Sequence, residues 1–283
     1  KNSTELFLLN KFIKSGLLTA NIKLKFDVKG KIKDDYKING FVENAEFGLL
    51  NKFNTEDLNF EFSISKNKYT LKNVGVKFNN IRLSLPIIEV NENNNLFLVS
   101  GKVETKEKDF NANKLNLLSY DLIKYLNIKK IKFNSINQFS FNINKKLKLS
   151  NLNIVSNISL NQLIIKKNLL QIKSYLPNYN ETVILENHKI VVNFNKKKID
   201  IKGNGKISIN EKSDSFNYQI TKKNNQFKFD INGNLKNNKL LINFLEYEKK
   251  ENLESFISIK GIFKKNNQLR FDLINLKEKN NEI

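Results

Sequence analysis

The sequence contains no cysteine, no methionine, no tryptophan and only one histidine, His188. Without cysteine the chain can form no disulfide, no thiolate nucleophile and no Cys-ligated zinc or iron–sulfur site. One histidine cannot supply a two-histidine metal site, and any Ser-His-Asp arrangement would depend on that residue alone. His188 lies between Asn187 and Lys189, so we interpret it as a turn residue. We therefore expect a non-enzymatic protein with no cofactor and no metal.

Long apolar runs are also missing, and none reaches the roughly 18 residues that a membrane-spanning helix needs. The sequence does not begin with methionine. We therefore expect residues 1–283 to be a segment of a longer protein, with any signal peptide or membrane anchor upstream.

The charge is strongly one-sided, because 49 Lys+Arg face 28 Asp+Glu for a net charge of +21. Only Arg82 and Arg270 are arginines, whereas recognition of phosphate and of base edges relies mainly on arginine. We therefore interpret the lysines as solvated surface residues and expect no nucleic-acid partner. Attraction to an anionic membrane surface is the alternative.

Apolar and polar residues alternate with a period of two throughout the chain, as in Ile22-Lys23-Leu24-Lys25-Phe26. Successive side chains of a strand point to opposite faces, so each such segment has one apolar and one polar face. This pattern is typical of antiparallel sheets that are wetted on one side. Asp27, Asp230 and Asp272 each stand between two apolar residues, and we expect them to face water rather than to form a metal cluster.

Short polar breaks rich in asparagine separate the alternating segments, although the chain has only 10 Gly and 2 Pro. Asparagine tolerates left-handed backbone and hydrogen-bonds its own turn, so it can replace glycine in hairpins. We interpret Gly203 and Gly205 as bulge or turn glycines. No linker divides the chain, and we predict one continuous β-groove segment over 1–283. Helical spacing of apolar residues predicts short helices over 1–18 and 115–128.

The fold class that follows is all-β: an elongated, twisted antiparallel meander curled into a groove, with one to three short helices. A meander with one apolar face must cover it with a second sheet, close on itself, or bind something apolar. We expect the alternating apolar residues to line one trough that holds acyl chains. The predicted lining is Ile22, Leu24, Phe26, Val28, Leu58, Phe60, Phe62, Ile64, Phe139, Phe141, Ile143, Ile190, Val192, Phe194, Phe227, Phe229, Ile231, Leu269, Phe271 and Leu273.

The stretch from Leu17 to Glu104 resembles the AsmA-like family of the Gram-negative envelope. The resemblance rests on the rhythm of a strand that ends in glycine, a polar turn and a second strand. It is seen in Ile22–Asp27, Tyr36–Gly40, Phe41–Glu46, Leu58–Phe62 and Phe97–Val103. It implies a repeating β-groove, an inner-membrane anchor upstream, and a periplasmic location. It also implies passage of phospholipid to the outer membrane, with possible outer-membrane partners, and no catalytic residues.

Other functions fit the same pattern. The first alternative is a structural or adhesive envelope protein in which two sheets close on each other as a sandwich or solenoid. The next is an outer-membrane barrel, which would require the lysines to line a pore. An enzyme comes last.

Overall fold

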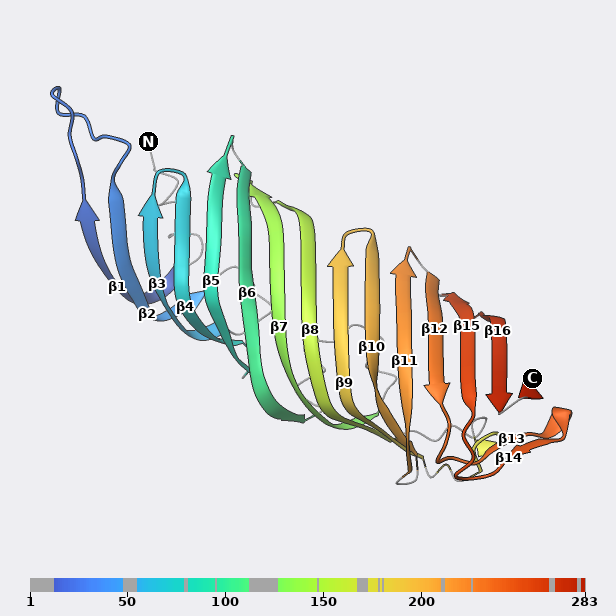
Figure 1. Cartoon of the computed structure of the whole chain (residues 1–283). Coiled ribbons are helices and arrows are strands. Elements are labelled where there is room, and N and C mark those ends of the chain that lie inside the picture. The colour runs from blue at the N-terminus through green and yellow to red at the C-terminus, as the bar shows by residue number, and fades with distance from the viewer. Residues whose placement is uncertain are drawn as a thin grey trace. The chain divides into compact units, whose positions relative to one another are not determined.

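The structure is a computed structural model that describes residues 13–47, 55–78, 81–94, 96–111, 127–146, 148–166, 173–177, 179, 181–209, 212–224, 226–264, 268–278 and 281–282. These residues form almost entirely β-structure (Figure 1). The first eight strands are β1 (Ile13–Lys23), β2 (Lys37–Phe47), β3 (Thr55–Ser65), β4 (Lys68–Phe78), β5 (Ile81–Asn93), β6 (Leu96–Asn111), β7 (Ile128–Asn144) and β8 (Leu149–Lys166). The remaining strands are β9 (Thr182–Asn195), β10 (Lys198–Ile209), β11 (Lys212–Lys223), β12 (Gln226–Asn234), β13 (Leu240–Ile242), β14 (Tyr247–Lys249), β15 (Phe256–Lys264), β16 (Leu269–Glu278) and β17 (Asn281–Glu282).

Neighbours in sequence are neighbours in the sheet. Fifteen strands follow the order β1 to β12, then β15, β16 and β17, and the small β13–β14 hairpin forms a separate two-stranded sheet. The order begins at β1 and ends at β17, so the sheet is open. The predicted all-β antiparallel meander is thus confirmed, and an open, one-sided meander is consistent with a curled groove.

The chain divides into two compact units, which are described separately. Unit 1 comprises Lys1–Thr105 and Ile136–Ile154, and unit 2 comprises Lys106–Ser135 and Val155–Ile283. Strands β1–β5 lie wholly in unit 1 and β9–β17 wholly in unit 2.

The predicted helices are not borne out where the structure describes the chain. Residues 13–18 of the first predicted helix belong to β1, and residue 128 of the second begins β7. Residue 127 is described and is neither helix nor strand, and residues 1–12 and 115–126 lie outside the described residues. Pairing with β2 overrides the local helical spacing in β1, since Leu17 and Leu18 stand opposite Glu43 and Val42. The helical element described is the 3-10 turn Asn243–Leu245. No helix in the described ranges is long and apolar enough to cross a membrane.

Asparagine builds the tight turns between strands, as its frequency predicts. The side-chain oxygen of Asn195 accepts backbone N–H bonds from Lys197 and Lys198, each at 2.9 Å. Asn67 and Asn224 take positive φ values of 58° and 55° in their hairpins. Such residues close two-residue loops without glycine, because asparagine tolerates the left-handed region better than other side chains.

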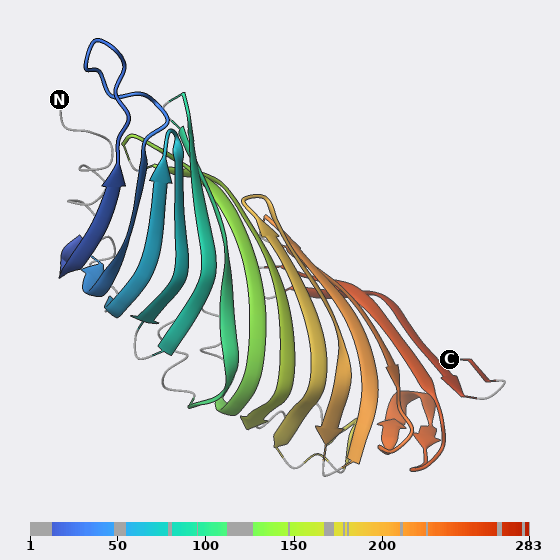
Figure 2. The ribbon, with the colours of Figure 1, turned by 60° about the vertical axis from the view of Figure 1, so that its left-hand side comes forward.

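Left-handed residues also lie inside strands, where they form β-bulges. Asn44, Asp57, Asn73 and Asn187 have φ values of 50–54°, and the ladder of each strand changes register at that point. A bulge adds one residue to a strand, bends it and increases its twist. The strands curve along their length accordingly (Figure 2).

The residue after each of these four left-handed residues is buried. In unit 1 these residues are Ala45, Leu58 and Val74, which together with Val42 form one core cluster. In unit 2 the residue is His188, which is 1% exposed. A bulge resets the alternation, so that Val42 and Ala45, three residues apart, reach the same face.

Candidate functional site

The candidate site in unit 1 is the apolar face of its sheet. Directly paired residues of antiparallel strands share a face, so the register shows which side chains lie together. One row across β1 to β6 runs Ile22, Ile38, Ile64, Tyr69, Val90 and Val99. The next row runs Ala20, Gly40, Phe62, Leu71, Ile88 and Gly101. Both rows lack a charged residue over six strands, and we call this surface the apolar face of unit 1.

The opposite side of the same strands is polar along the row between these two. It runs Asn21, Asn39, Ser63, Thr70, Glu89 and Ser100. Lys68 forms an ion pair with Glu89 at 3.0 Å. The sheet of unit 1 therefore separates apolar from polar side chains, as the alternation predicts.

Unit 2 repeats the arrangement over β9, β10, β11, β12, β15 and β16. One row runs Val192, Ile201, Ile220, Phe229, Gly261 and Phe271, and the next runs Ile190, Gly203, Tyr218, Ile231, Ile259 and Ile274. A third row runs Phe194, Ile199, Lys222, Phe227, Phe263 and Leu269. Lys222, the one charged residue of the three rows, lies over the ring of Phe227 at 5.3 Å. These rows are the apolar face of unit 2.

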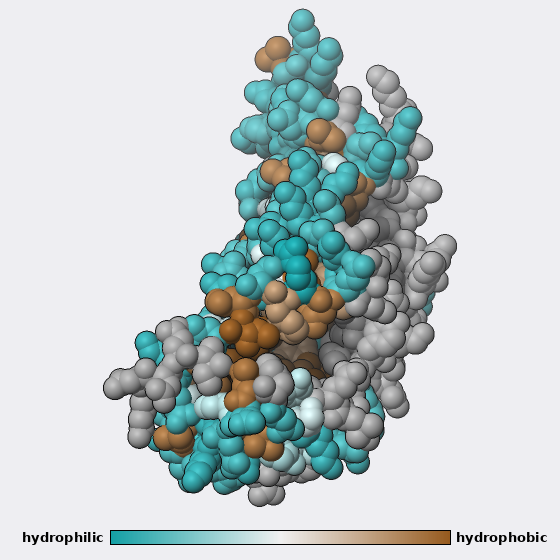
Figure 3. Space-filling view, turned by 90° about the vertical axis from the view of Figure 1, so that its right-hand side faces the viewer, coloured by the Kyte–Doolittle hydropathy of each residue, from teal (hydrophilic) through white to brown (hydrophobic). Residues whose placement is uncertain are grey.

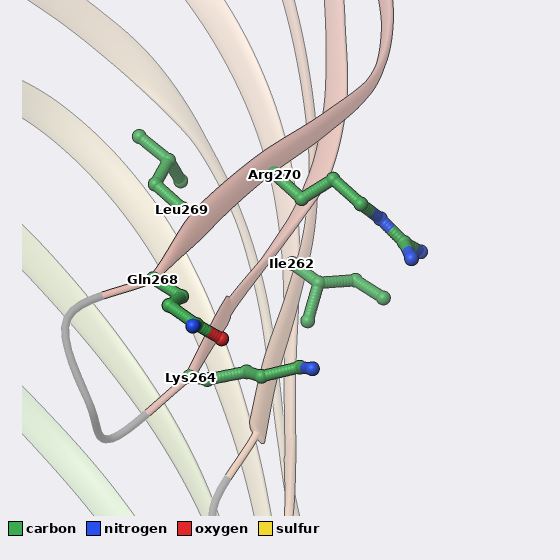
Figure 4. A pocket seen from close by; sticks show the side chains of 5 residues that line it. All are labelled: Ile262, Lys264, Gln268, Leu269 and Arg270. Carbon is green, nitrogen blue, oxygen red and sulfur yellow. The ribbon is translucent and has the colours of Figure 1, made fainter.

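The polar face of unit 2 holds lysines beside acids. Lys202, Gln219, Asp230 and Lys260 form one row across β10, β11, β12 and β15, and the Lys260 ammonium lies 3.1 Å from Asp230. Figure 4 shows the alternation in β16, where the side chain of Leu269 leaves the strand on the side opposite to Arg270. A depression of about 280 Å³ at this place is lined by Ile262, Lys264, Gln268, Leu269 and Arg270.

Aromatic rings lie over glycines on both apolar faces. A β-carbon added at Gly40 would meet the Phe62 ring at 2.6 Å. The same holds for a β-carbon added at four other glycines. It would lie 2.4 Å from the Tyr218 ring at Gly203, 2.4 Å from Phe216 at Gly233, 2.6 Å from Phe229 at Gly261 and 2.7 Å from Phe139 at Gly101. In four of these pairs the two residues are direct partners on adjacent strands. The rings occupy the level that β-carbons would fill, and this keeps the apolar faces smooth.

His188 belongs to this surface and not to a turn, so the prediction of a turn residue is wrong. It lies inside β9, directly after the bulge at Asn187, and Gly205 of β10 leaves room for its ring. Its Nε2 lies 2.9 Å from the carbonyl oxygen of Lys206 and its Nδ1 lies 3.2 Å from the Tyr218 hydroxyl. Because a carbonyl can only accept, Nε2 donates, and Nδ1 accepts the Tyr218 proton. Burial raises the pKa of the Tyr218 hydroxyl.

The two glycines next to this site are strand residues. Gly203 and Gly205 both lie within β10, where Gly203 pairs with Ile190 and Gly205 stands opposite the bulge at Asn187 and His188 of β9. A turn at these glycines is therefore wrong, and of the two only Gly205 stands at a bulge, whose extra residue is on the partner strand.

Most of the predicted lining residues share the apolar faces. In unit 1 these are Ile22, Leu58, Phe60, Phe62 and Ile64 in β1 and β3, and Phe139 in β7, whose ring lies over Gly101, with Phe141 and Ile143 at alternating positions of the same strand. The rings of Phe139 and Phe141 stack with centroids 5.8 Å apart. In unit 2 they are Ile190, Val192, Phe194, Phe227, Phe229, Ile231, Leu269 and Phe271.

Four predicted lining residues lie elsewhere. Leu24, Phe26 and Val28 follow the end of β1 and belong to the loop that leads to β2. Here Asp27 accepts backbone N–H bonds from Lys29 and Lys31, which favours a turn over a longer strand. Leu273 pairs with Lys260 on the polar face, because one extra residue in β16 shifts the register after Phe271. Ile274 takes the place on the apolar face that alternation assigned to Leu273.

One end of the apolar face of unit 2 is covered by the chain itself. Leu235 and Leu240, in the segment between β12 and β14, pack with Leu276 and contact Phe216 and Ile257. Asp214, at the start of β11, holds this segment by accepting backbone N–H bonds from Lys236 and Asn237 at 2.9 and 2.8 Å.

The covering segment is also held by a buried lysine, which the sequence analysis did not identify. Lys249 of β14 donates to the carbonyl oxygens of Lys236, Asn238 and Lys250 at 2.7–3.2 Å. Burial lowers the pKa of its ammonium group. No pattern marks it in the sequence, since it stands between two charged residues in the run Tyr247-Glu248-Lys249-Lys250.

Away from this end, the described residues provide no second sheet over either apolar face, since the one other sheet is β13–β14. In β9, β10 and β11 the apolar side chains of these rows are half-buried, while their polar neighbours are mostly exposed. Viewed from the side of β16, the molecule shows a hollow with apolar surface at its mouth (Figure 3). Within the described ranges no cluster of three histidine or acidic side chains could hold a metal ion.

No protein-family model, no curated protein and no solved structure matches the chain.

Proposed function

We propose that this chain is part of a non-enzymatic lipid conduit, whose apolar faces hold the acyl chains of phospholipids while the headgroups stay in water. The observation that carries the proposal is the unbroken apolar rows over six strands in each unit, with no second sheet covering them in the described residues. Each methylene group removed from water contributes about 0.8 kcal/mol to binding, so an acyl chain can bind such a surface without a specific pocket.

The smooth surface supports the same conclusion. Aromatic rings fill the space over Gly40, Gly203, Gly233 and Gly261, so no side-chain pocket opens at these four glycines. A sliding ligand needs such a track, because a deep pocket would hold it in one place. We propose the setting that the AsmA-like resemblance implies: a periplasmic segment of a longer protein that is anchored in the inner membrane and passes phospholipid towards outer-membrane components.

A structural or adhesive protein is the second candidate. The observation that favours it is the segment that contains Leu235 and Leu240, because there the chain covers its own apolar face. In such a protein a second sheet would close over the remaining rows.

Site-specific photo-crosslinking in the full-length protein separates the two candidates. A crosslinking residue at Ile220 lies on the apolar face, and one at Gln219 lies on the polar face of the same strand. Phe60 and Glu61 form the corresponding pair in β3. We expect phospholipid adducts at Ile220 and Phe60, identified by mass spectrometry, and none at the two controls. Equal labelling of both faces, or protein adducts alone at Ile220, would reject the conduit.

A further inference from the structure

The connection between β1 and β2 forms a small projecting hairpin, which we call the β1–β2 tip (residues 24–33). It extends beyond the ends of β1 and β2, at the blue end of the ribbon (Figures 1 and 2). Phe26 and Ile32 form a β-bridge. Asp27 donates its N–H to the Lys31 carbonyl at 2.8 Å, and Lys33 donates to that of Lys25 at 2.7 Å. The tip therefore has its own hydrogen-bonded shape.

The tip exposes large apolar side chains. Val28 is 104% exposed, Phe26 is 56% exposed and Ile32 is 55% exposed. Single exposed apolar residues are common on protein surfaces, but several on one projection mark a contact surface. The turn fixes them there, since the Asp27 side chain accepts the N–H groups of Lys29 and Lys31 at 2.8 and 2.9 Å.

The same tip is positively charged. The two acids that follow the tip are neutralised, because Asp35 pairs with Lys25 at 2.6 Å and Asp34 pairs with Lys66 of the β3–β4 turn. Among the residues that the structure describes, Lys29 and Lys31 have no carboxylate in ion-pair range. Lys29 follows Val28 directly and Lys31 lies two residues further on, while the one acid within the tip, Asp27, accepts their backbone N–H groups. Two unpaired ammonium groups thus share the turn with the most exposed apolar side chain.

We propose that the β1–β2 tip docks on the surface of an anionic lipid bilayer, with Val28 and Phe26 among the headgroups and acyl boundary and Lys29 and Lys31 on lipid phosphates. An exposed apolar anchor that shares its turn with unpaired lysines matches the chemistry of that interface, where apolar insertion and charge attraction act together. The proposal goes beyond the conduit, because it concerns where the chain touches a membrane and rests on none of the apolar rows.

The absence of tryptophan permits a direct test. In the full chain carrying Val28→Trp, we expect a blue shift of the emission with vesicles of phosphatidylglycerol and phosphatidylcholine in equal parts. Brominated lipids should quench that emission. Vesicles of phosphatidylcholine alone should give a weak shift or none. Adding Lys29→Glu and Lys31→Glu should lower the vesicle partition coefficient at least ~10-fold, since each lysine near such a surface contributes a substantial attraction.

Two controls are matched to these changes. Val191→Trp places the same reporter at an exposed valine that pairs with Lys202 on the polar face of unit 2. Lys196→Glu with Lys197→Glu reverses the same charge in the exposed β9–β10 turn. Val191→Trp should show no blue shift with anionic vesicles, and the charge reversal at Lys196 and Lys197 should leave the partition coefficient unchanged.

Three results would each overturn the proposal. They are no shift at Val28→Trp, an equal shift at Val191→Trp, and partitioning unchanged by the tip charge reversal. A shift that depends on protein concentration without vesicles would instead assign the tip to self-association. Adding Ile220→Glu should leave the shift intact, which separates tip docking from lipid held on the apolar faces.

Discussion

The imidazole of His188 lies against the backbone of Gly205 on the adjacent strand, so closely that a β-carbon at Gly205 would stand 2.3 Å from the ring. The contact exists because the bulge at Asn187 turns His188 onto the apolar face, where Tyr218 and the Lys206 carbonyl satisfy its two nitrogens. Ring and glycine are therefore one structural unit, like the Phe62–Gly40 and Phe229–Gly261 pairs.

The first prediction concerns that contact. Gly205→Ala should lower the free energy of unfolding by about 1–3 kcal/mol, because the ring must leave its place and its two hydrogen bonds. Gly75→Ala is the matched control, since Gly75 lies in β4 with open space around its missing β-carbon. Urea unfolding of both variants measures the difference. Equal unfolding midpoints would contradict the role given to the pair.

The second prediction concerns the bulges. Asn187→Val should destabilise the chain by about 1–2 kcal/mol, because a β-branched residue strongly disfavours the left-handed conformation that φ of 53° requires. Asn187→Gly should stay within about 0.5 kcal/mol of the native chain, since glycine adopts positive φ readily. Asn193→Val, in the same strand and outside the left-handed region, serves as control. Thermal unfolding of the three variants measures the effect. The prediction is refuted if Asn187→Val does not have the lowest melting temperature of the three.

The third prediction concerns lipid on the apolar face of unit 2. Ile220→Glu should abolish phospholipid co-purification with the full-length protein, because an unpaired carboxylate on an apolar surface disfavours hydrocarbon beside it. Gln219→Glu introduces the same group one residue earlier, on the polar face between Lys202 and Asp230. That variant should retain its lipid. Mass spectrometry of extracted lipid provides the measurement, and equal retention by the two variants would count against the conduit.

The fourth prediction concerns acid stability. Lys198 lies 2.7 Å from one carboxylate oxygen of Asp200 and Thr221 donates to the other at 2.7 Å. The Lys198 hydrogen bond, followed by that of Thr221, holds the pKa of Asp200 below its ordinary value of 3.8. A lowered carboxyl pKa stabilises the fold at neutral pH, and this contribution is lost as the pH falls through the folded-state value.

Asp200→Asn should therefore flatten the acid side of the stability profile. Between about pH 4 and about pH 2 the native chain should lose more unfolding free energy than the variant, by less than ~1 kcal/mol, because the ion pair is partly solvated. Lys198→Met should flatten the profile in the same sense. Chemical unfolding at several pH values tests both variants, and parallel profiles for all three proteins would disprove the assignment.

Much of the fold could be predicted because the information is local. The alternation in Ile190–Phe194 and Phe227–Ile231 is a property of neighbouring residues, and a strand translates it directly into two faces. The breaks were predictable for the same reason, since a turn at Asn195 needs only the side chain of that residue and the next backbone groups.

The bulges were missed although the sequence contains a signal for them. Val42-Glu43-Asn44-Ala45, Leu71-Lys72-Asn73-Val74 and Leu185-Glu186-Asn187-His188 share one pattern: an apolar residue, a charged residue, asparagine and a buried residue. In each run, strict alternation ends at the asparagine, and the buried residue follows directly after it. The polar neighbours of His188 favour a turn there, and unbroken alternation puts Leu273 on the wrong face.

The sequence by itself determined that the chain is an antiparallel meander with one apolar and one polar face, because period-two alternation and asparagine turns act within a few residues. Only the tertiary structure decided where that alternation is reset, which rings lie over which glycines, and where β1 gives way to the projecting loop of Val28. These features depend on the register between strands. Register is set by residues far apart in sequence, such as His188 and Gly205, that meet only when the sheet has formed.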